Sequence, residues 1–158
     1  MGIPVHPLLV HAAVVLVPLL AVLAIAYAAA PFVRPHIRWV LGLLAVATPF
    51  AALLAKLSGD AFFARLQSRH RITPPYFPKI EGHRHFGTMT LYSVIVLALV
   101  TLAMVYLVAP RVEAARAAGS MRFAPLVLRA LAVVAALVSL YYVVRTGDSG
   151  AKTVWTGS

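Results

Sequence analysis

The 158-residue chain is 62% hydrophobic and only 11% charged, and its mean hydropathy is +0.91. Because a soluble domain of this length carries about a quarter charged residues, the composition excludes an ordinary soluble fold and indicates a membrane protein. Cysteine is absent, which excludes disulfides, thiolate metal sites, iron–sulfur clusters and covalently attached haem within this chain. The net charge of +10 comes from basic residues between apolar runs, where they meet lipid headgroups, so no nucleic-acid partner is expected.

Four apolar segments predict four transmembrane helices, because a bilayer core needs roughly 20 apolar residues to cross. The predicted spans cover approximately residues 7–30, 37–57, 85–108 and 123–144. Residues 58–84 are predicted to form one long hydrophilic loop, which begins where Ser58-Gly59-Asp60 ends the second helix. No internal repeat is recognisable. The sequence therefore predicts a single domain over residues 1–158, an all-α polytopic membrane protein built as a four-transmembrane-helix bundle.

An even number of crossings places the N-terminus, the C-terminus and the 58–84 loop on the same side of the membrane. Every histidine except His36 then belongs to one membrane face. The two short connections on the other face, residues 31–38 and 109–122, are rich in arginine. The positive-inside rule favours short basic connections in the cytoplasm, so the histidine-rich face is predicted to be extracytoplasmic.

The strongest candidate segment is His6-Pro7-Leu8-Leu9-Val10-His11, at the start of the first apolar run. Pro7 suits the first position of a helix, so His6 is predicted at the helix cap and His11 about one turn inside the span. An ionisable side chain at that depth in a membrane protein indicates a functional site.

Three hypotheses for this site remain open. In the first, the protein binds b-type haem through axial ligands drawn from His6, His11, His83 and His85. The preferred pair is His11 with His83 or His85, because the first and third spans start from the same surface, and Met89 is a fallback ligand.

In the second hypothesis the site holds a transition-metal ion through a mixed set of nitrogen and oxygen ligands, namely His6, His11, Asp60 and His83. In the third, the chain is a purely structural subunit without a cofactor, in which His6 and His83 cap helices and Asp60 pairs with Arg65 or Arg84. No nucleophile–base pair, phosphate loop or row of carboxylates inside the spans is visible, so a hydrolase, a proton pump or an ion channel is not expected.

The chain resembles an uncharacterised bacterial family of four-helix membrane proteins, the domain of unknown function 2231. The resemblance rests on the H-P-L-x-V-H opening, on an S-G-[ED] step after the second helix, on a histidine four residues before a glycine, and on a G-H-S-G-A-x-x-V-W type ending. These motifs are matched by His6 to His11, Ser58-Gly59-Asp60, His83 with Gly87, and Gly147-Asp148-Ser149-Gly150-Ala151-Lys152-Thr153-Val154-Trp155.

This chain departs from the family pattern at Asp148, which stands where the pattern often has histidine. The resemblance implies a multi-pass protein of the bacterial cell membrane. Some relatives join such a domain to Rieske-type or cytochrome c-type modules. This implies a small redox-associated or accessory subunit of a respiratory-type membrane complex, with the lipid bilayer and other membrane subunits as its partners.

Overall fold

The computed structural model describes residues 5–70, 72, 74–107 and 123–155. Within this part of the chain all the regular structure is helical, which confirms the predicted all-α class. The elements in chain order are α1 (Val5–Ala29), η1 (Pro31–Val33), α2 (Arg34–Ser68), η2 (Pro74–Tyr76), α3 (Phe77–Leu107) and α5 (Ala124–Trp155). The four α-helices in these ranges are each long and apolar enough to cross a membrane.

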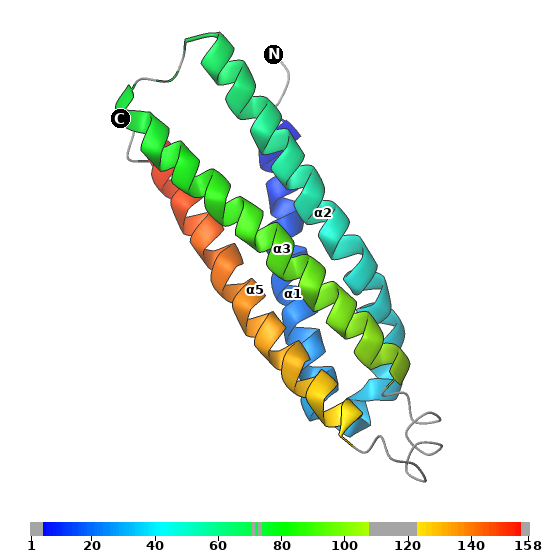
Figure 1. Ribbon diagram of the computed structural model, residues 1–158. Coiled ribbons are helices and arrows are strands. Elements are labelled where there is room, and N and C mark those ends of the chain that lie inside the picture. The colour runs from blue at the N-terminus through cyan, green and yellow to red at the C-terminus, as the bar shows by residue number, and fades with distance from the viewer. Residues whose placement is uncertain (1–4, 71, 73, 108–122, 156–158) are drawn as a thin grey trace.

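The helices form a four-membered ring in which α1 packs against α2 and α5, and α3 packs against the same two helices. Helices α1 and α3 are therefore diagonal partners across the bundle. Figure 1 shows the start of α1, the end of α5 and the connection between α2 and α3 at one end of the molecule. The first residues of α1 and the last residues of α5 that the structure describes therefore lie at the same end of the bundle, as the sequence predicted for four crossings.

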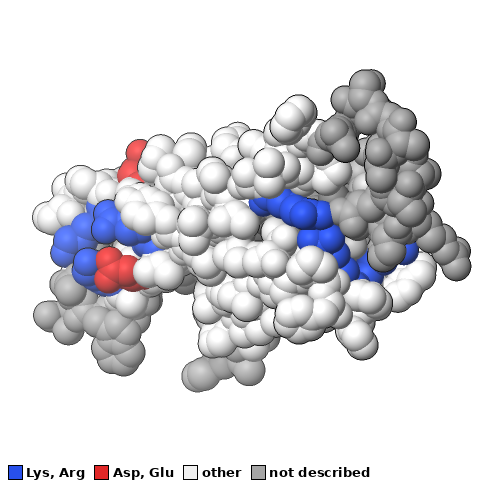
Figure 2. Space-filling view, turned by 90° about the horizontal axis from the view of Figure 1, so that it is seen from below, with Lys and Arg blue, Asp and Glu red and all other residues white. Residues whose placement is uncertain are grey.

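Charged side chains gather towards the two ends of the bundle. Figure 2 shows this from below, with an uncharged surface between the two groups of Lys and Arg. Large apolar side chains on the helices are exposed, among them Leu43 and Leu99. In water such a surface would aggregate, whereas in a bilayer it meets hydrocarbon, so the distribution fits a protein that spans the membrane.

The helices are longer than the sequence predicted, and the 58–84 segment is not one hydrophilic loop. Helix α2 continues to Ser68, and α3 begins at Phe77, with Pro78 in its first turn. Helix α5 likewise runs past residue 144 to Trp155. Gly59, which the sequence placed at the end of the second helix, lies inside α2, and Gly150 lies inside α5; the missing side chain of each glycine leaves room for a histidine ring.

The two helical hairpins bury equivalent positions, a correspondence that the sequence did not reveal. Each buried residue of α1 from Ala13 to Tyr27 matches a buried residue of α3 at one constant offset, and the buried residues of α2 between Leu41 and Ala52 match those of α5 at another. The α1–α3 pairs are Ala13 and Thr90, Val17 and Val94, Leu20 and Leu97, Ala21 and Ala98, Ala24 and Thr101, and Tyr27 and Met104. The α2–α5 pairs are Leu41 and Ala132, Leu44 and Ala135, Ala45 and Ala136, Thr48 and Ser139, and Ala52 and Val143.

This correspondence relates the α1–α2 hairpin to the α3–α5 hairpin by an approximate two-fold rotation about the long axis of the bundle. The ring order agrees, because such a rotation exchanges α1 with α3 and α2 with α5. Each position in the α1–α2 hairpin therefore has an equivalent position in the α3–α5 hairpin.

The equivalent core residues Leu20 and Leu97 are both fully buried, so truncating either one should open a similar cavity. We expect Leu20→Ala and Leu97→Ala each to lower the free energy of unfolding by about 2 kcal/mol or more, and the lipid-facing Leu99→Ala to have little effect. Thermal unfolding in detergent measures all three, and equal losses for Leu97→Ala and Leu99→Ala would contradict the assigned core.

Candidate functional site

Two histidines, one from each hairpin, bond to a serine of the partner helix. His6 on α1 lies with its Nδ1 3.0 Å from the Ser58 hydroxyl on α2. His83 on α3 lies with its Nδ1 3.1 Å from the Ser149 hydroxyl on α5. All four side chains are at the end of the bundle that holds the α2–α3 connection, and each pair ties two neighbouring helices together.

The serine hydroxyls determine which ring nitrogen carries the proton. Ser58 donates its hydrogen to the Ala55 carbonyl at 2.9 Å, and Ser149 donates its hydrogen to the Thr146 carbonyl at 3.0 Å. A hydroxyl has a single hydrogen, so each serine oxygen can only accept from the imidazole. The Nδ1–H group of each ring is therefore the donor, and in the neutral imidazole Nε2 keeps its lone pair.

A glycine next to each serine lets the imidazole lie directly on the helix backbone. A Cβ atom added to Gly59 would stand 2.9 Å from Cε1 of His6, and one added to Gly150 would stand 3.0 Å from Cε1 of His83. Both distances are shorter than ordinary van der Waals contact. The Ser-Gly pair in α2 and the Ser-Gly pair in α5 are thus equivalent, and each one packs against a single imidazole.

His6 and His83 lie on the diagonal helices α1 and α3, at positions related by the same offset as the buried residues of these helices. The His6 ring also stacks on Phe62 of α2, with ring centroids 6.2 Å apart and an angle of 19° between the planes. We call the two imidazoles with Ser58, Gly59, Ser149 and Gly150 the paired imidazole site.

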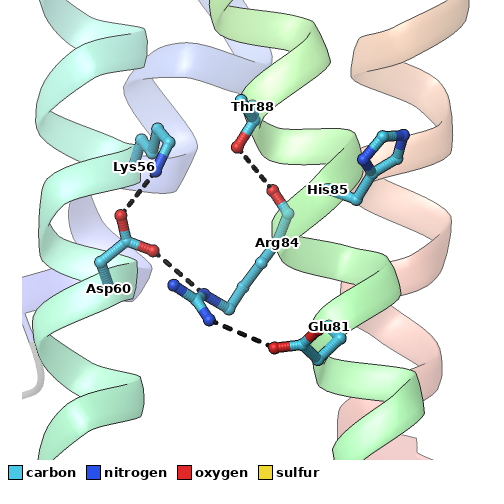
Figure 3. A pocket seen from close by; sticks show the side chains of 6 residues that line it. All are labelled: Lys56, Asp60, Glu81, Arg84, His85 and Thr88. Carbon is cyan, nitrogen blue, oxygen red and sulfur yellow. Dashed lines mark hydrogen bonds and ion pairs between the residues drawn. The ribbon is translucent and has the colours of Figure 1, made fainter.

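An ion-pair cluster links α2 to α3 beside this site, as Figure 3 shows. Asp60 accepts a hydrogen bond from Lys56 at 2.6 Å and another from Arg84 at 3.1 Å, and Arg84 also lies 3.6 Å from Glu81. The cluster lines a polar pocket of about 220 Å³. Arg84 is the partner that the structural hypothesis proposed for Asp60, so this part of that hypothesis is confirmed.

Other predicted ligands face away from the paired imidazole site. His11 is exposed, and its Nδ1–H donates to the Pro7 carbonyl of its own helix. His85 is exposed too, and in Figure 3 its ring points away from Asp60. Met89 lines an apolar groove of about 360 Å³ between α3 and α5. The preferred pair, His11 with His83 or His85, is therefore not brought together.

Helix geometry explains this outcome. Successive residues of an α-helix are about 100° apart, so positions five apart or two apart point in different directions. Because α1 already begins at Val5, His6 is helical rather than a cap outside the helix, and His11 is carried to another face. The same rule separates His85 from His83.

The four predicted metal ligands are not gathered either. Within the described residues, no group of three or more His, Cys, Asp or Glu side chains is close enough to hold a metal ion. Asp60 is directed to Lys56 and Arg84, and His11 faces outwards. Asp148, at the family's histidine position, is exposed and pairs with Lys152 at 2.7 Å, so its side chain does not contribute to the paired imidazole site.

Sequence reasoning singled out Ser58-Gly59 and Ser149-Gly150 only as motif letters and missed their contact with His6 and His83. The positions of these residues along the sequence could have indicated the contact. Each hairpin has a histidine near the start of its first helix and a Ser-Gly step near the end of its second helix. Antiparallel packing brings those two positions to the same level.

A family described as "Predicted membrane protein (DUF2231)" matches residues 2–158 of the chain. The chain belongs to this family, and it is a multi-pass membrane protein. The comparison with curated proteins found no match. The comparison with solved structures found none either.

The glycine contacts give a matched test within α2. Gly42 has open space where a Cβ would go, so Gly42→Ala should raise the free energy of unfolding by up to about 1 kcal/mol through helix propensity. Gly59→Ala should give no such gain, because the new methyl group displaces the His6 ring from Ser58. Thermal unfolding of both variants in detergent measures the difference, and equal stabilisation would contradict the contact.

A second test separates the bridge between helices from the pairs within one helix. Asp60 and Asp148 each bond a lysine four residues away, but Asp60 also bonds Arg84 of α3. We expect Asp60→Asn to cost about 1 kcal/mol of unfolding free energy, and Asp148→Asn to cost close to nothing. The loss in Asp60→Asn should shrink at high salt in thermal unfolding experiments; identical behaviour of the two variants would rule out a cross-helix role for Asp60.

Proposed function

We propose that this membrane protein binds one b-type haem, with His6 and His83 as the two axial ligands, and serves as a small redox-associated subunit of a respiratory-type membrane complex. One observation carries the proposal: the Nδ1 atom of each imidazole lies at hydrogen-bond distance from a serine hydroxyl that itself donates to a carbonyl, an arrangement that favours the Nδ1–H tautomer and an Nε2 with a free lone pair. Neutral imidazole nitrogens are typical haem ligands, and a hydrogen bond from the other nitrogen to a protein acceptor is typical of ligating histidines.

The surroundings of the two rings support the choice of haem over a bare metal ion. Two imidazoles satisfy a haem iron, because the porphyrin supplies the other four ligands, whereas a protein site for zinc or a similar ion needs three or four protein ligands. The cations Lys56 and Arg84 line the polar pocket beside the paired imidazole site and would pair with the acidic substituents of a bound haem. When bound, the haem supplies reversible one-electron transfer. The chain's own residues hold and orient the two imidazoles.

We further propose that the paired imidazole site faces the extracytoplasmic side of a bacterial cell membrane. The short basic connections of the sequence support this orientation through the positive-inside rule. Electrons would then pass between the site and a partner subunit at that surface.

Titration of the purified protein with haem b, followed by the visible spectrum of the oxidised and reduced forms, tests the proposal. We expect one haem per chain. His6→Ala and His83→Ala should each weaken binding by at least about tenfold, because each removes one iron ligand.

The matched controls are His11→Ala and His85→Ala, which remove exposed imidazoles of the same two helices and should bind haem as the unaltered protein does. Loss of binding in His11→Ala with retention in His6→Ala would overturn the ligand assignment. Absence of haem binding together with a stoichiometric colourless metal would favour the metal-ion hypothesis. Absence of both would leave a structural subunit.

A further inference from the structure

The paired imidazole site consists of two copies of one three-part unit, and each hairpin contributes one copy. In each copy an imidazole donates to a serine hydroxyl, the serine donates to the carbonyl three residues before it, and the next residue is a glycine under the ring. The serines occupy equivalent positions, because Ser58 and Ser149 continue the constant offset that relates the buried residues of α2 to those of α5. His6 and His83 likewise continue the offset between α1 and α3.

We propose that Ser58 and Ser149 are positioning residues, which act through His6 and His83 rather than on the ligand, and which present both Nε2 atoms equivalently to one ligand on the two-fold axis of the bundle. This inference rests on the proposed function for the identity of the ligand. The inference adds that the ligand offers two equivalent coordination positions on opposite sides, as a haem iron does.

The chemical reason is the single hydrogen of each serine. With that hydrogen committed to the Ala55 or Thr146 carbonyl, the serine oxygen can only accept, and it thereby selects the Nδ1–H tautomer. A serine that donated to Nδ1 instead would leave the hydrogen of the neutral ring on Nε2 and block ligation there. Accepting from Nδ1–H also raises the basicity of Nε2.

The surroundings of the two units differ in two respects. The His6 ring stacks on Phe62, whose counterpart position in α5 is Thr153. The second difference is one of charge. The residue after Gly59 is Asp60, which bridges to Arg84 beside His83, whereas the residue after Gly150 is Ala151. Pro7, the counterpart of Arg84 in α1, has no charge either. The ion-pair cluster therefore closes the α2–α3 side of the site, and the α1–α5 side has no equivalent bridge from these two positions.

The first experiment needs no haem. The ¹⁵N spectrum of histidine-labelled protein in detergent, at about pH 8.5 where free imidazoles are neutral, distinguishes the two tautomers. Signals of His6 and His83 are assigned from their loss in His6→Gln and His83→Gln. We expect Nδ1–H to dominate for both rings, Ser58→Ala to shift His6 alone towards Nε2–H, and Ser149→Ala to shift His83 alone.

Two controls make this outcome specific. Ser93→Ala removes a serine that makes the same hydrogen bond to the carbonyl three residues back, that of Thr90. Within the described residues Ser93 makes no hydrogen bond to an imidazole, so its loss should shift neither ring. Ser58→Thr and Ser149→Thr keep the hydroxyl and should restore the Nδ1–H signal. Unchanged tautomers in both alanine variants would overturn the positioning role.

The second experiment uses the haem-loaded protein. Because the serine acceptor makes each imidazole a stronger donor to ferric iron, Ser58→Ala and Ser149→Ala should both raise the midpoint potential, and by similar amounts. A shift in only one variant would overturn the equivalence of the two units. Failure of the unaltered protein to bind haem would end the proposed function while the ¹⁵N result still decided the positioning role.

Discussion

At the end of the bundle that holds the α2–α3 connection, the packing of the helices depends on the contact between an imidazole edge and the backbone of a neighbouring helix. In a membrane, helices associate through close packing and hydrogen bonds rather than through the hydrophobic effect, and small residues at the contact allow that approach. Gly59 and Gly150 provide the space, and Ser58 and Ser149 satisfy the ring nitrogen that would otherwise be buried without a partner. The position of each histidine thus follows from two small residues, one serine and one glycine, on the neighbouring helix. The same contact that joins the helices of a hairpin also fixes the direction in which the ring presents Nε2.

The two-fold relation between the hairpins turns two such contacts into one candidate site. A rotation that exchanges α1 with α3 places His6 and His83 at the same level on diagonal helices. The bundle below them is filled symmetrically, with Val17 opposite Val94 and Leu20 opposite Leu97. The two sides differ in charge, since Asp60 and Arg84 join α2 to α3 and their counterparts are uncharged. They also differ in the Phe62 ring that stacks on His6.

The architecture was largely predictable from the sequence, because four long apolar runs leave few alternatives to four spanning helices with both ends on one side. Helix ends were less predictable. Gly59 and Gly150 carry the composition of a chain reversal, yet they lie within helices because the partner imidazole takes the place of a side chain. For the candidate site, His6 and His83 were among the residues that the sequence offered, but their hydrogen bonds to Ser58 and Ser149 were not predicted, and His11 was preferred to His6. That choice treated His6 as a cap, and only the structure shows the helix beginning before it, at Val5.

The proposal that His6 and His83 share one ligand between the two hairpins can be decided by electron paramagnetic resonance of the ferric protein loaded with one equivalent of haem b, because the spin state reports the number of strong axial ligands. We expect a six-coordinate low-spin spectrum with two imidazole ligands. A five-coordinate high-spin spectrum from the unaltered protein would show that a single imidazole reaches the iron, and would contradict this proposal.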